Sequence, residues 1–365
     1  MKGFDDVITV KAPGKLYIAG EYAVVEPGYE AIVVAVDQFV TVSIEQAQKF
    51  GTINSKQYQE TSVFWQRKGN QLVIDNRDNP FEYILSSIKY TEEYALEKRH
   101  ELALFDLTVN SQLDSDDGKK YGLGSSAAVT VATVRALSEF YQLHLSAEEI
   151  FKLAAISHFK VQNNGSFGDL AASVYGGWIA YQSPDRQWLT NMLASRPLVE
   201  VIQLPWPQLK VEPLQFPPDL NLLIGWSGKP ASTPILVDQI ATSRAHAAQH
   251  YQEFLHASRQ CLQTMITGFK QQNSHVIKQQ LTVNRQLLRD LANFSGVTIE
   301  TKKLTQLCEI ALHHGAAAKS SGAGGGDCGI AVINADPKVR QALLADWQQH
   351  QIQPLNFNVY SLQKD

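Results

Sequence analysis

Glycine, serine and lysine cluster in three segments of the chain, and their spacing suits the binding of a phosphorylated ligand. The middle segment, residues 122–128, reads Gly-Leu-Gly-Ser-Ser-Ala-Ala and precedes a predicted helix. Glycine lets the backbone come close to a ligand, and the N–H groups at a helix start attract anions. The serine hydroxyls can add hydrogen bonds or a magnesium ligand. The segment predicts a phosphate-binding loop, or else a plain serine cap after a turn.

The middle segment is not a Walker A loop, because the Gly-Lys-Ser/Thr ending is missing.

The segment nearest the N-terminus, residues 11–22, follows a predicted strand and contains two lysines, two glycines and a carboxylate. Lys15, directly after Pro13 and Gly14, is placed to reach a phosphoryl group. The alternative is a hairpin turn whose lysines are solvated.

The third segment, residues 319–329, has glycine at five of its eleven positions. So much glycine costs backbone entropy on folding, and a loop that wraps closely around a ligand justifies that cost better than a simple connection does. Apolar elements flank it on both sides, which favours a ligand-binding loop over a flexible linker.

Hydrophobic periodicity predicts the elements that position these segments. Alternating or Val- and Ile-rich runs predict strands at residues 7–11, 31–45, 102–113 and 177–182. Spacings of three and four predict helices at 126–143 and 146–159, and Ser146 with Glu149 form a capping box at the start of the second.

Six prolines between residues 193 and 218 exclude a long helix or a central strand there. We predict a domain boundary in this stretch, which gives an N-terminal domain of residues 1–215 and a C-terminal domain of residues 216–365. The second domain is expected to contain strands at 221–226 and 329–333, two or three helices within 236–294, and a helix at 299–314. Strands and helices in both halves indicate α+β architecture.

Composition limits the functional class. The formal net charge of −4 argues against non-specific nucleic-acid binding, which needs a broad cationic surface. The three cysteines, Cys261, Cys308 and Cys328, have neither a disulfide pattern nor metal-binding spacing, so we expect a reducing compartment. No stretch is apolar enough for a signal peptide or a membrane span. A cytoplasmic protein without a membrane partner is expected, as a monomer or a homodimer.

Taken together and in this order, the three segments resemble those of the GHMP kinases, the family of galactokinase, homoserine kinase and the kinases of mevalonate metabolism. The resemblance spans nearly the whole chain. It implies an N-terminal domain like the second domain of ribosomal protein S5, a ferredoxin-like C-terminal domain, and an active site between them.

Three stretches resemble the branch of this family that phosphorylates phosphomevalonate. The first, residues 15–28, has Tyr22 where mevalonate kinases usually have His. The second is the Asn-Gly-Ser-Phe-Gly-Asp-Leu-Ala run at 164–171, and the third is the long glycine loop at 319–329. The implied reaction is ATP-dependent conversion of (R)-5-phosphomevalonate to (R)-5-diphosphomevalonate in isoprenoid biosynthesis. Alternatives are a family member that phosphorylates a hydroxyl, such as mevalonate kinase, and a non-catalytic sensor.

The resemblance also implies roles for single residues. Lys15 and Asp169 are the implied catalytic pair, and a magnesium ion that accompanies ATP is held by Ser126. We expect Asp169 to hold Lys15 as an ion pair rather than to act as a base, and it also suits the cap of a helix starting at Leu170. ATP is expected to contact Lys119, Gly122, Leu123, Gly124, Ser125, Ser126 and Ala127. The second substrate is expected to contact Lys15, Glu21, Tyr22, Lys160, Ser166, Ser321, Gly322 and Ala323.

Lys160 departs from the mevalonate kinase pattern. It stands about where that branch has a magnesium-binding Glu, and a lysine cannot bind a metal cation. We expect it instead to face the phosphate of the acceptor.

Overall fold

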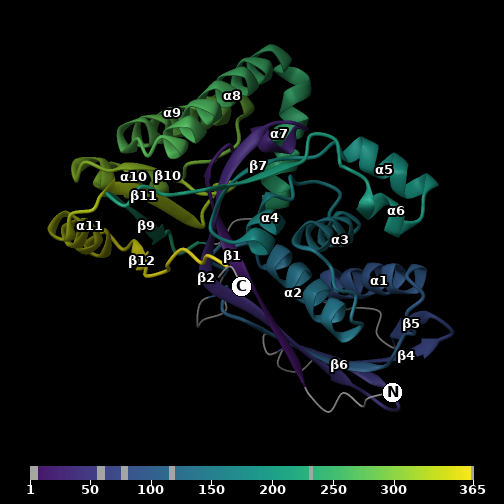
Figure 1. Cartoon of the computed structure of the whole chain (residues 1–365). Helices are drawn as coiled ribbons and strands as arrows, with labels where there is room; N and C mark the ends of the chain where they lie inside the picture. Colours follow the sequence, from purple (N-terminus) through teal and green to yellow (C-terminus); the bar gives the residue numbers. More distant parts are fainter. Residues whose placement is uncertain (1–6, 56–61, 75–80, 115–119, 230–232, 363–365) are drawn as a thin grey trace.

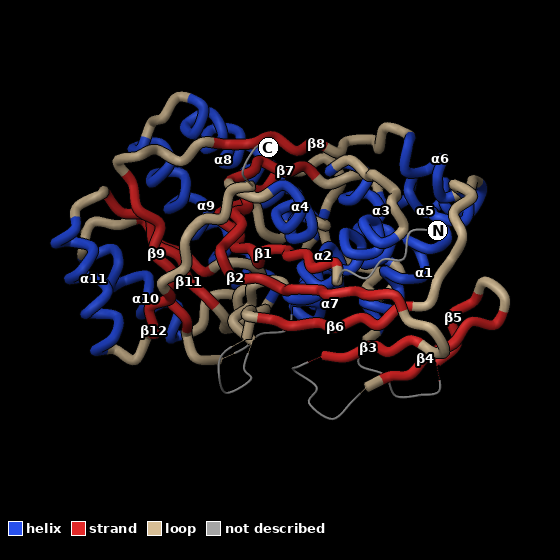
Figure 2. The backbone as a smooth tube through the Cα atoms, turned by 60° about the horizontal axis from the view of Figure 1, so that its bottom comes forward, coloured by secondary structure: helices blue, strands red, loops and turns tan. Residues whose placement is uncertain are grey.

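The computed structural model describes residues 7–55, 62–74, 81–114, 120–229 and 233–362, and its strands form two sheets (Figures 1 and 2). The larger sheet contains β1 (Ile8–Ala19), β2 (Glu30–Gln46), β3 (Gly51–Ser55), β4 (Val63–Lys68), β5 (Gln71–Ile74), β6 (Phe105–Ser111), β7 (Trp178–Gln182) and β8 (Lys210–Leu214). The smaller sheet contains β9 (Leu220–Trp226), β10 (Ala317–Ser320), β11 (Cys328–Asn334) and β12 (Gln353–Leu355).

The helices are numbered in the order of the chain. They are α1 (Glu82–Glu97), α2 (Ser125–Phe140), α3 (Ala147–Phe159), α4 (Gly168–Tyr175), α5 (Arg186–Ser195), α6 (Leu198–Gln203), α7 (Thr233–His246), α8 (Ala248–Lys270), α9 (Ser274–Ser295), α10 (Lys302–His313) and α11 (Pro337–Gln349), with a short 3-10 helix at Ala23–Val25. None of the helices in the described part is long and apolar enough to cross a bilayer. The predicted capping box of α3 is confirmed, because the Ser146 and Glu149 side chains each bond the other's backbone N–H.

The larger sheet is organised around the 17-residue strand β2. The first part of β2 pairs with β7 and its last part with β6, and β1 runs antiparallel along most of the length of β2. Residues 31–36 are fully buried, whereas buried and partly exposed residues alternate from residue 40 onward. The continuous apolar run therefore marks where both faces of β2 are covered, and the alternation marks where one face meets solvent. Helices α2 and α4 pack on β1 and β2.

Strand β1 corrects one sequence-based expectation. Residues 11–22 do not follow a strand, because Pro13, Gly14 and Lys15 lie inside β1, which runs to Ala19. The pairing with β2 shifts register between Pro13 and Gly14 and again between Tyr17 and Ala19. A proline inside a strand is tolerated at such an irregularity. The shift also leaves the Lys15 N–H to donate to Leu123 O at 2.9 Å, which joins the strand directly to the middle glycine segment.

The proline-rich stretch contains only short elements, as predicted. Strand β8 accepts Pro213 because it lies at the edge of the larger sheet and pairs with β7 alone. The next strand, β9, belongs to the smaller sheet. The chain later returns to the larger sheet, where Val359 bridges to Val36. The boundary between residues 215 and 216 remains a prediction.

The smaller sheet is antiparallel, with strand order β10-β11-β9-β12. In order along the chain these are strands 2, 3, 1 and 4, which is the arrangement of a split β-α-β ferredoxin-like unit. The predicted α+β architecture is thus confirmed, with α7, α8 and α9 as predicted helices between the first two strands of this unit.

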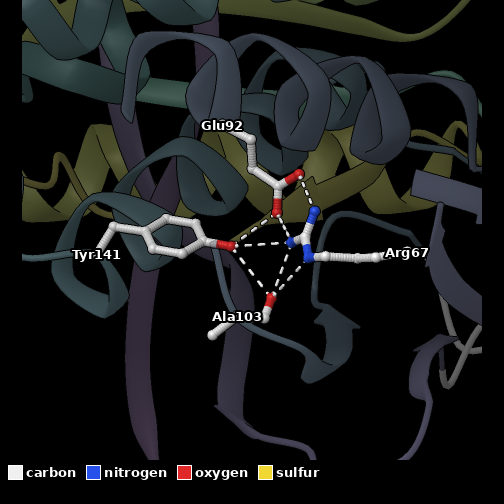
Figure 3. A network of polar contacts seen from close by, with 4 residues as sticks. All are labelled: Arg67, Glu92, Ala103 and Tyr141. Atoms are coloured by element: carbon white, nitrogen blue, oxygen red, sulfur yellow. Dashed lines mark hydrogen bonds and ion pairs between the residues drawn. The ribbon is translucent and has the colours of Figure 1, made fainter. Parts of the chain in front are cut away.

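A buried polar network joins strand β4 of the larger sheet to helix α1 and to the end of helix α2 (Figure 3). Arg67 of β4 pairs with Glu92 of α1 through both carboxylate oxygens. Arg67 also donates to Ala103 O at 2.8 Å, and the Tyr141 hydroxyl donates to Glu92 Oε1 at 2.7 Å. Burial and the adjacent Glu92 raise the pKa of Tyr141, so its hydroxyl stays protonated as a donor.

We expect Tyr141→Phe to lower the free energy of unfolding by roughly 1.5–3 kcal/mol, because it removes a buried hydrogen bond to a charged group. Urea denaturation measures this loss. Tyr90→Phe is the matched control, since Tyr90 lies on the same helix as Glu92 and makes no hydrogen bond through its hydroxyl to any described residue. Equal losses from the two substitutions would contradict the role of the Tyr141 hydroxyl.

Candidate active site

One cavity of about 450 Å³ brings all three glycine-rich segments together. Predicted site residues that line it are Lys15, Glu21, Tyr22, Gly122, Leu123, Gly124, Ser125, Ser126, Ser166, Asp169, Gly322 and Ala323. Helix α7 of the C-terminal half contributes Val237. The cavity therefore lies where residues from both halves of the chain meet.

The middle segment begins as a loop with two glycines in left-handed conformation, and α2 begins directly after this loop. Gly122 and Gly124 have φ of 80° and 78°, which L side chains rarely adopt. Gly124 occupies the cap position of α2, and no side chain caps this helix start, so neither serine is the cap. The first N–H groups of α2 thus lack a partner within the helix, and they suit an anion. Ala127 is fully buried and does not line the cavity, so its expected contact with ATP is not supported.

Lys15 lies against this loop. Its side chain is only 8% exposed, and Nζ donates to Gly122 O at 3.0 Å. Its side-chain carbons also lie close to Gly124, where a Cβ atom would approach Lys15 Cε to 3.0 Å. The strand β1 thus delivers a buried ammonium group to the loop that is predicted to hold phosphates. The alternative of a turn with solvated lysines is therefore wrong for Lys15, although Lys11 is exposed.

Asp169 lies near the same point, but two expectations about it are wrong. The cap of α4 is Phe167, in a left-handed conformation, and Asp169 falls in the first helical turn, where Oδ1 accepts from Leu170 N at 3.0 Å. Lys15 and Asp169 both lie in the described part of the chain, and no ion pair joins them there. Lys15 bonds the loop carbonyl instead.

The third segment is joined to the first by a buried ion pair. Lys319 is fully buried and pairs with Glu21, which is 3% exposed and also accepts from Gly322 N at 3.3 Å. The Tyr22 hydroxyl donates to Ala323 O at 2.6 Å, and Ser321 Oγ donates to Tyr17 O at 2.9 Å. Ser321 is therefore used to hold the loop rather than to line the cavity. These bonds fix the glycine loop over the end of β1.

Another part of the cavity wall is built by Tyr17, Ser166 and their neighbours. Tyr17 OH and Ser166 Oγ lie 2.9 Å apart, and Tyr181 OH donates to Ser166 O at 2.5 Å. Burial, and secondly the charge of Asp169, raises the pKa of Tyr17, so the phenol remains protonated. This wall is neutral and offers hydroxyl groups to a polar ligand.

Comparison with known proteins decides the family. The model described as GHMP kinases N terminal domain matches residues 82–177, and the model described as GHMP kinases C terminal matches residues 265–350. Phosphomevalonate kinase of Streptomyces sp. (strain CL190) is 38% identical over 335 residues, which cover 89% of each chain. The chain belongs to the GHMP kinase family.

Two solved structures resemble this GHMP kinase over nearly its whole length. A protein from Listeria innocua is 36% identical, with a TM-score of 0.92 over 97% of this chain and 98% of that one. Phosphomevalonate kinase of Streptococcus pneumoniae in complex with phosphomevalonate and AMPPNP is 30% identical, with a TM-score of 0.85 over 97% of this chain and all of that one. The GHMP kinase fold is thereby confirmed.

Of the two other lysines expected at the site of this GHMP kinase, Lys160 lies outside the cavity and Lys119 falls outside the described residues. Lys160 is exposed after the last residue of α3 and lies outside the cavity lining. Residues two apart on a helix point in nearly opposite directions, so it is His158 that faces the cavity. The position of Lys160 does not support contact with the acceptor phosphate. Lys119 lies outside the described residues, and its neighbour Lys120 lines the cavity.

His158 is a cavity residue that sequence reasoning did not select, and Tyr83 lines the cavity beside it. Their rings pack at 4.8 Å between centroids, and His158 Nε2 lies 3.3 Å from Ser126 Oγ. Burial lowers the pKa of His158, partly opposed by the charge of Asp169, which favours the neutral ring. No motif contains either residue. A histidine in the last turn of a helix otherwise suits interaction with the helix carbonyls, so sequence alone carries no signal for this role.

The balance of charged side chains in the cavity lining bears on how the cavity could bind phosphorylated molecules. Lys15 and Lys120 face Glu21, Asp169 and Asp327, so the wall has no excess of positive charge. No described residues form a cluster of three or more His, Cys, Asp or Glu suited to a metal ion. Magnesium fits this arrangement, because it usually keeps water and substrate phosphates as most of its ligands. Ser126, at the start of α2, would supply the protein ligand.

Proposed function

We propose that this GHMP kinase transfers the γ-phosphoryl group of ATP to (R)-5-phosphomevalonate and forms ADP and (R)-5-diphosphomevalonate, a step of isoprenoid biosynthesis. The juxtaposition of the Lys15 ammonium group with the glycine loop before α2 carries the phosphoryl-transfer part of the proposal. The choice of acceptor is supported by the Streptomyces relative and by the Streptococcus pneumoniae structure.

The chemistry requires two phosphate groups to approach each other despite their charge. Catalysis of phosphoryl transfer depends mainly on positioning and on neutralising the negative charge. Lys15, which contacts the glycine loop, would stabilise charge on the transferring group, and the first N–H groups of α2, which no side chain caps, would hold the donor phosphates. Magnesium bound with ATP would neutralise charge on the β- and γ-phosphates, with Ser126 as its protein ligand.

Asp169 has no obligatory role as a base in this reaction. A phosphate monoester has a second pKa near 6, so its attacking oxygen is largely deprotonated at pH 7. We propose that Asp169 orients groups around Lys15 when substrates are bound. Both side chains lie beside Gly124, since a Cβ atom there would lie 3.0 Å from Lys15 Cε and 3.6 Å from Asp169 Cβ.

The direct test measures ADP release from ATP and magnesium with three acceptors side by side. We expect turnover with 5-phosphomevalonate and none with mevalonate or 5-diphosphomevalonate. Turnover with mevalonate instead would overturn the acceptor assignment and leave a kinase of the same family. Nucleotide binding without ADP release for any acceptor would indicate a sensor. Omission of magnesium is expected to abolish turnover.

The pH dependence distinguishes the roles of Asp169. With the wild-type enzyme we expect kcat/KM to fall as the pH drops below about 6, because protonation of the acceptor phosphate blocks its attacking oxygen. Asp169→Asn should lower the rate but keep this acidic limb, since the limb belongs to the substrate. A pH–rate profile from pH 5 to 8 measures both. Loss of the acidic limb in Asp169→Asn would identify Asp169 as a base.

We also propose a cytoplasmic location. All three cysteines are buried free thiols, which suits a reducing compartment. Whether the protein is a monomer or a homodimer is a matter for sedimentation measurements.

A further inference from the structure

His158 is a cavity residue to which the proposed reaction assigns no role. Its side chain comes from the last turn of α3, is 4% exposed and lines the cavity. The ring is held from one side by Tyr83, whose hydroxyl in turn donates to Gln162 Oε1 at 3.0 Å. Nε2 lies 3.3 Å from Ser126 Oγ. The imidazole is therefore fixed in direction and in contact with the first turn of the nucleotide-binding helix.

The two ring nitrogens differ in their surroundings. Nδ1 is buried and has no hydrogen-bond partner among the described residues, whereas Nε2 faces the Ser126 hydroxyl. A neutral imidazole carries one N–H, and a buried N–H without an acceptor is rarer in proteins than a buried acceptor without a donor. The favoured tautomer therefore carries its proton on Nε2 and donates it to Ser126 Oγ.

This choice of tautomer decides what Ser126 offers to a ligand. A hydroxyl has one proton and two lone pairs. When His158 donates to one lone pair, the second lone pair remains for the ligand. The Ser126 proton, which the neighbouring Tyr83 hydroxyl can also accept, can turn to a phosphate oxygen. With the other tautomer, Nε2 would accept the Ser126 proton and leave only lone pairs toward the ligand, which suit magnesium but give the phosphate oxygens no donor.

We propose that His158 is a positioning residue that directs the hydroxyl proton of Ser126 toward the phosphates of the bound nucleotide. The inference rests on the proposed nucleotide site. It does not depend on which acceptor the enzyme uses.

The test compares the affinity of the purified enzyme and its variants for the magnesium complex of AMPPNP by titration calorimetry. Glutamine places an amide N–H near the position of Nε2, whereas leucine has no donor. We expect His158→Leu to weaken binding about tenfold, the effect of one hydrogen bond, and His158→Gln to recover most of the affinity. Asparagine reaches only the Nδ1 position, so His158→Asn should behave like His158→Leu and serves if the leucine variant does not fold.

A second background makes the test specific for Ser126. In Ser126→Ala the hydroxyl is absent, so adding His158→Leu should change affinity by no more than about twofold. Equal affinities of the glutamine, asparagine and leucine variants would overturn the proposal, as would a tenfold effect of His158→Leu that persists in Ser126→Ala. Failure of wild-type turnover with phosphomevalonate would overturn the acceptor assignment alone, because the binding comparison uses no acceptor.

Discussion

Replacing Lys15 with methionine is expected to lower kcat by roughly 10²–10³, by analogy with the removal of one oxyanion-hole donor. Methionine keeps much of the aliphatic volume and removes the charge. Lys15 is 8% exposed and bonds the carbonyl of Gly122, so the ammonium group acts in a largely enclosed site where its field is weakly screened. Steady-state measurement of ADP release with phosphomevalonate gives this value.

The loss should fall mainly on kcat rather than on the affinity for nucleotide. Charge that develops during transfer is present only in the transition state, and the loss of an interaction made only there lowers kcat and kcat/KM together. Binding of the magnesium complex of AMPPNP to Lys15→Met should stay within about tenfold of wild type, since the N–H groups of α2 remain. Lys160→Ala is the control and should leave both constants unchanged, because Lys160 is exposed outside the cavity. A kcat of Lys15→Met within tenfold of wild type would exclude the proposed role.

The second large effect concerns the buried pair of Lys319 and Glu21. We expect Lys319→Met to lower the free energy of unfolding by about 3–5 kcal/mol, because it leaves a carboxylate buried without its cation. Glu21 is 3% exposed, and its second oxygen already has no partner among the described residues. Only the weak contact from Gly322 N would remain to compensate the charge. Urea denaturation at pH 7 measures the loss.

Removal of both charges separates this cause from a simple packing defect. A buried ion pair can often be replaced by apolar residues of similar volume with little loss, so Glu21→Leu combined with Lys319→Met should be more stable than Lys319→Met alone. Lys302→Met, at the exposed first residue of α10, should change stability by less than about 0.5 kcal/mol. If Lys319→Met is as stable as Lys302→Met, the ion pair does not hold the glycine loop to β1.

Local patterns in the sequence determined the backbone conformation of the glycine loop, the start of a helix and the family of this protein. Glycines at 122 and 124 predicted backbone that only glycine adopts readily, and both residues have left-handed φ. Ser146 and Glu149 predicted the start of α3. These predictions succeed because turns, caps and periodicity depend on residues a few positions apart. The order of the three glycine segments likewise sufficed to identify the family.

The tertiary structure decided which side chains meet. Pairing of β1 with β2 and the bond from Lys15 N–H to Leu123 O set Lys15 against the loop. His158 rather than Lys160 enters the cavity, because the packing of α3 selects one side of that helix. Lys319 finds Glu21 across 298 positions of the chain. Such contacts depend on how distant elements pack, and no local pattern encodes them.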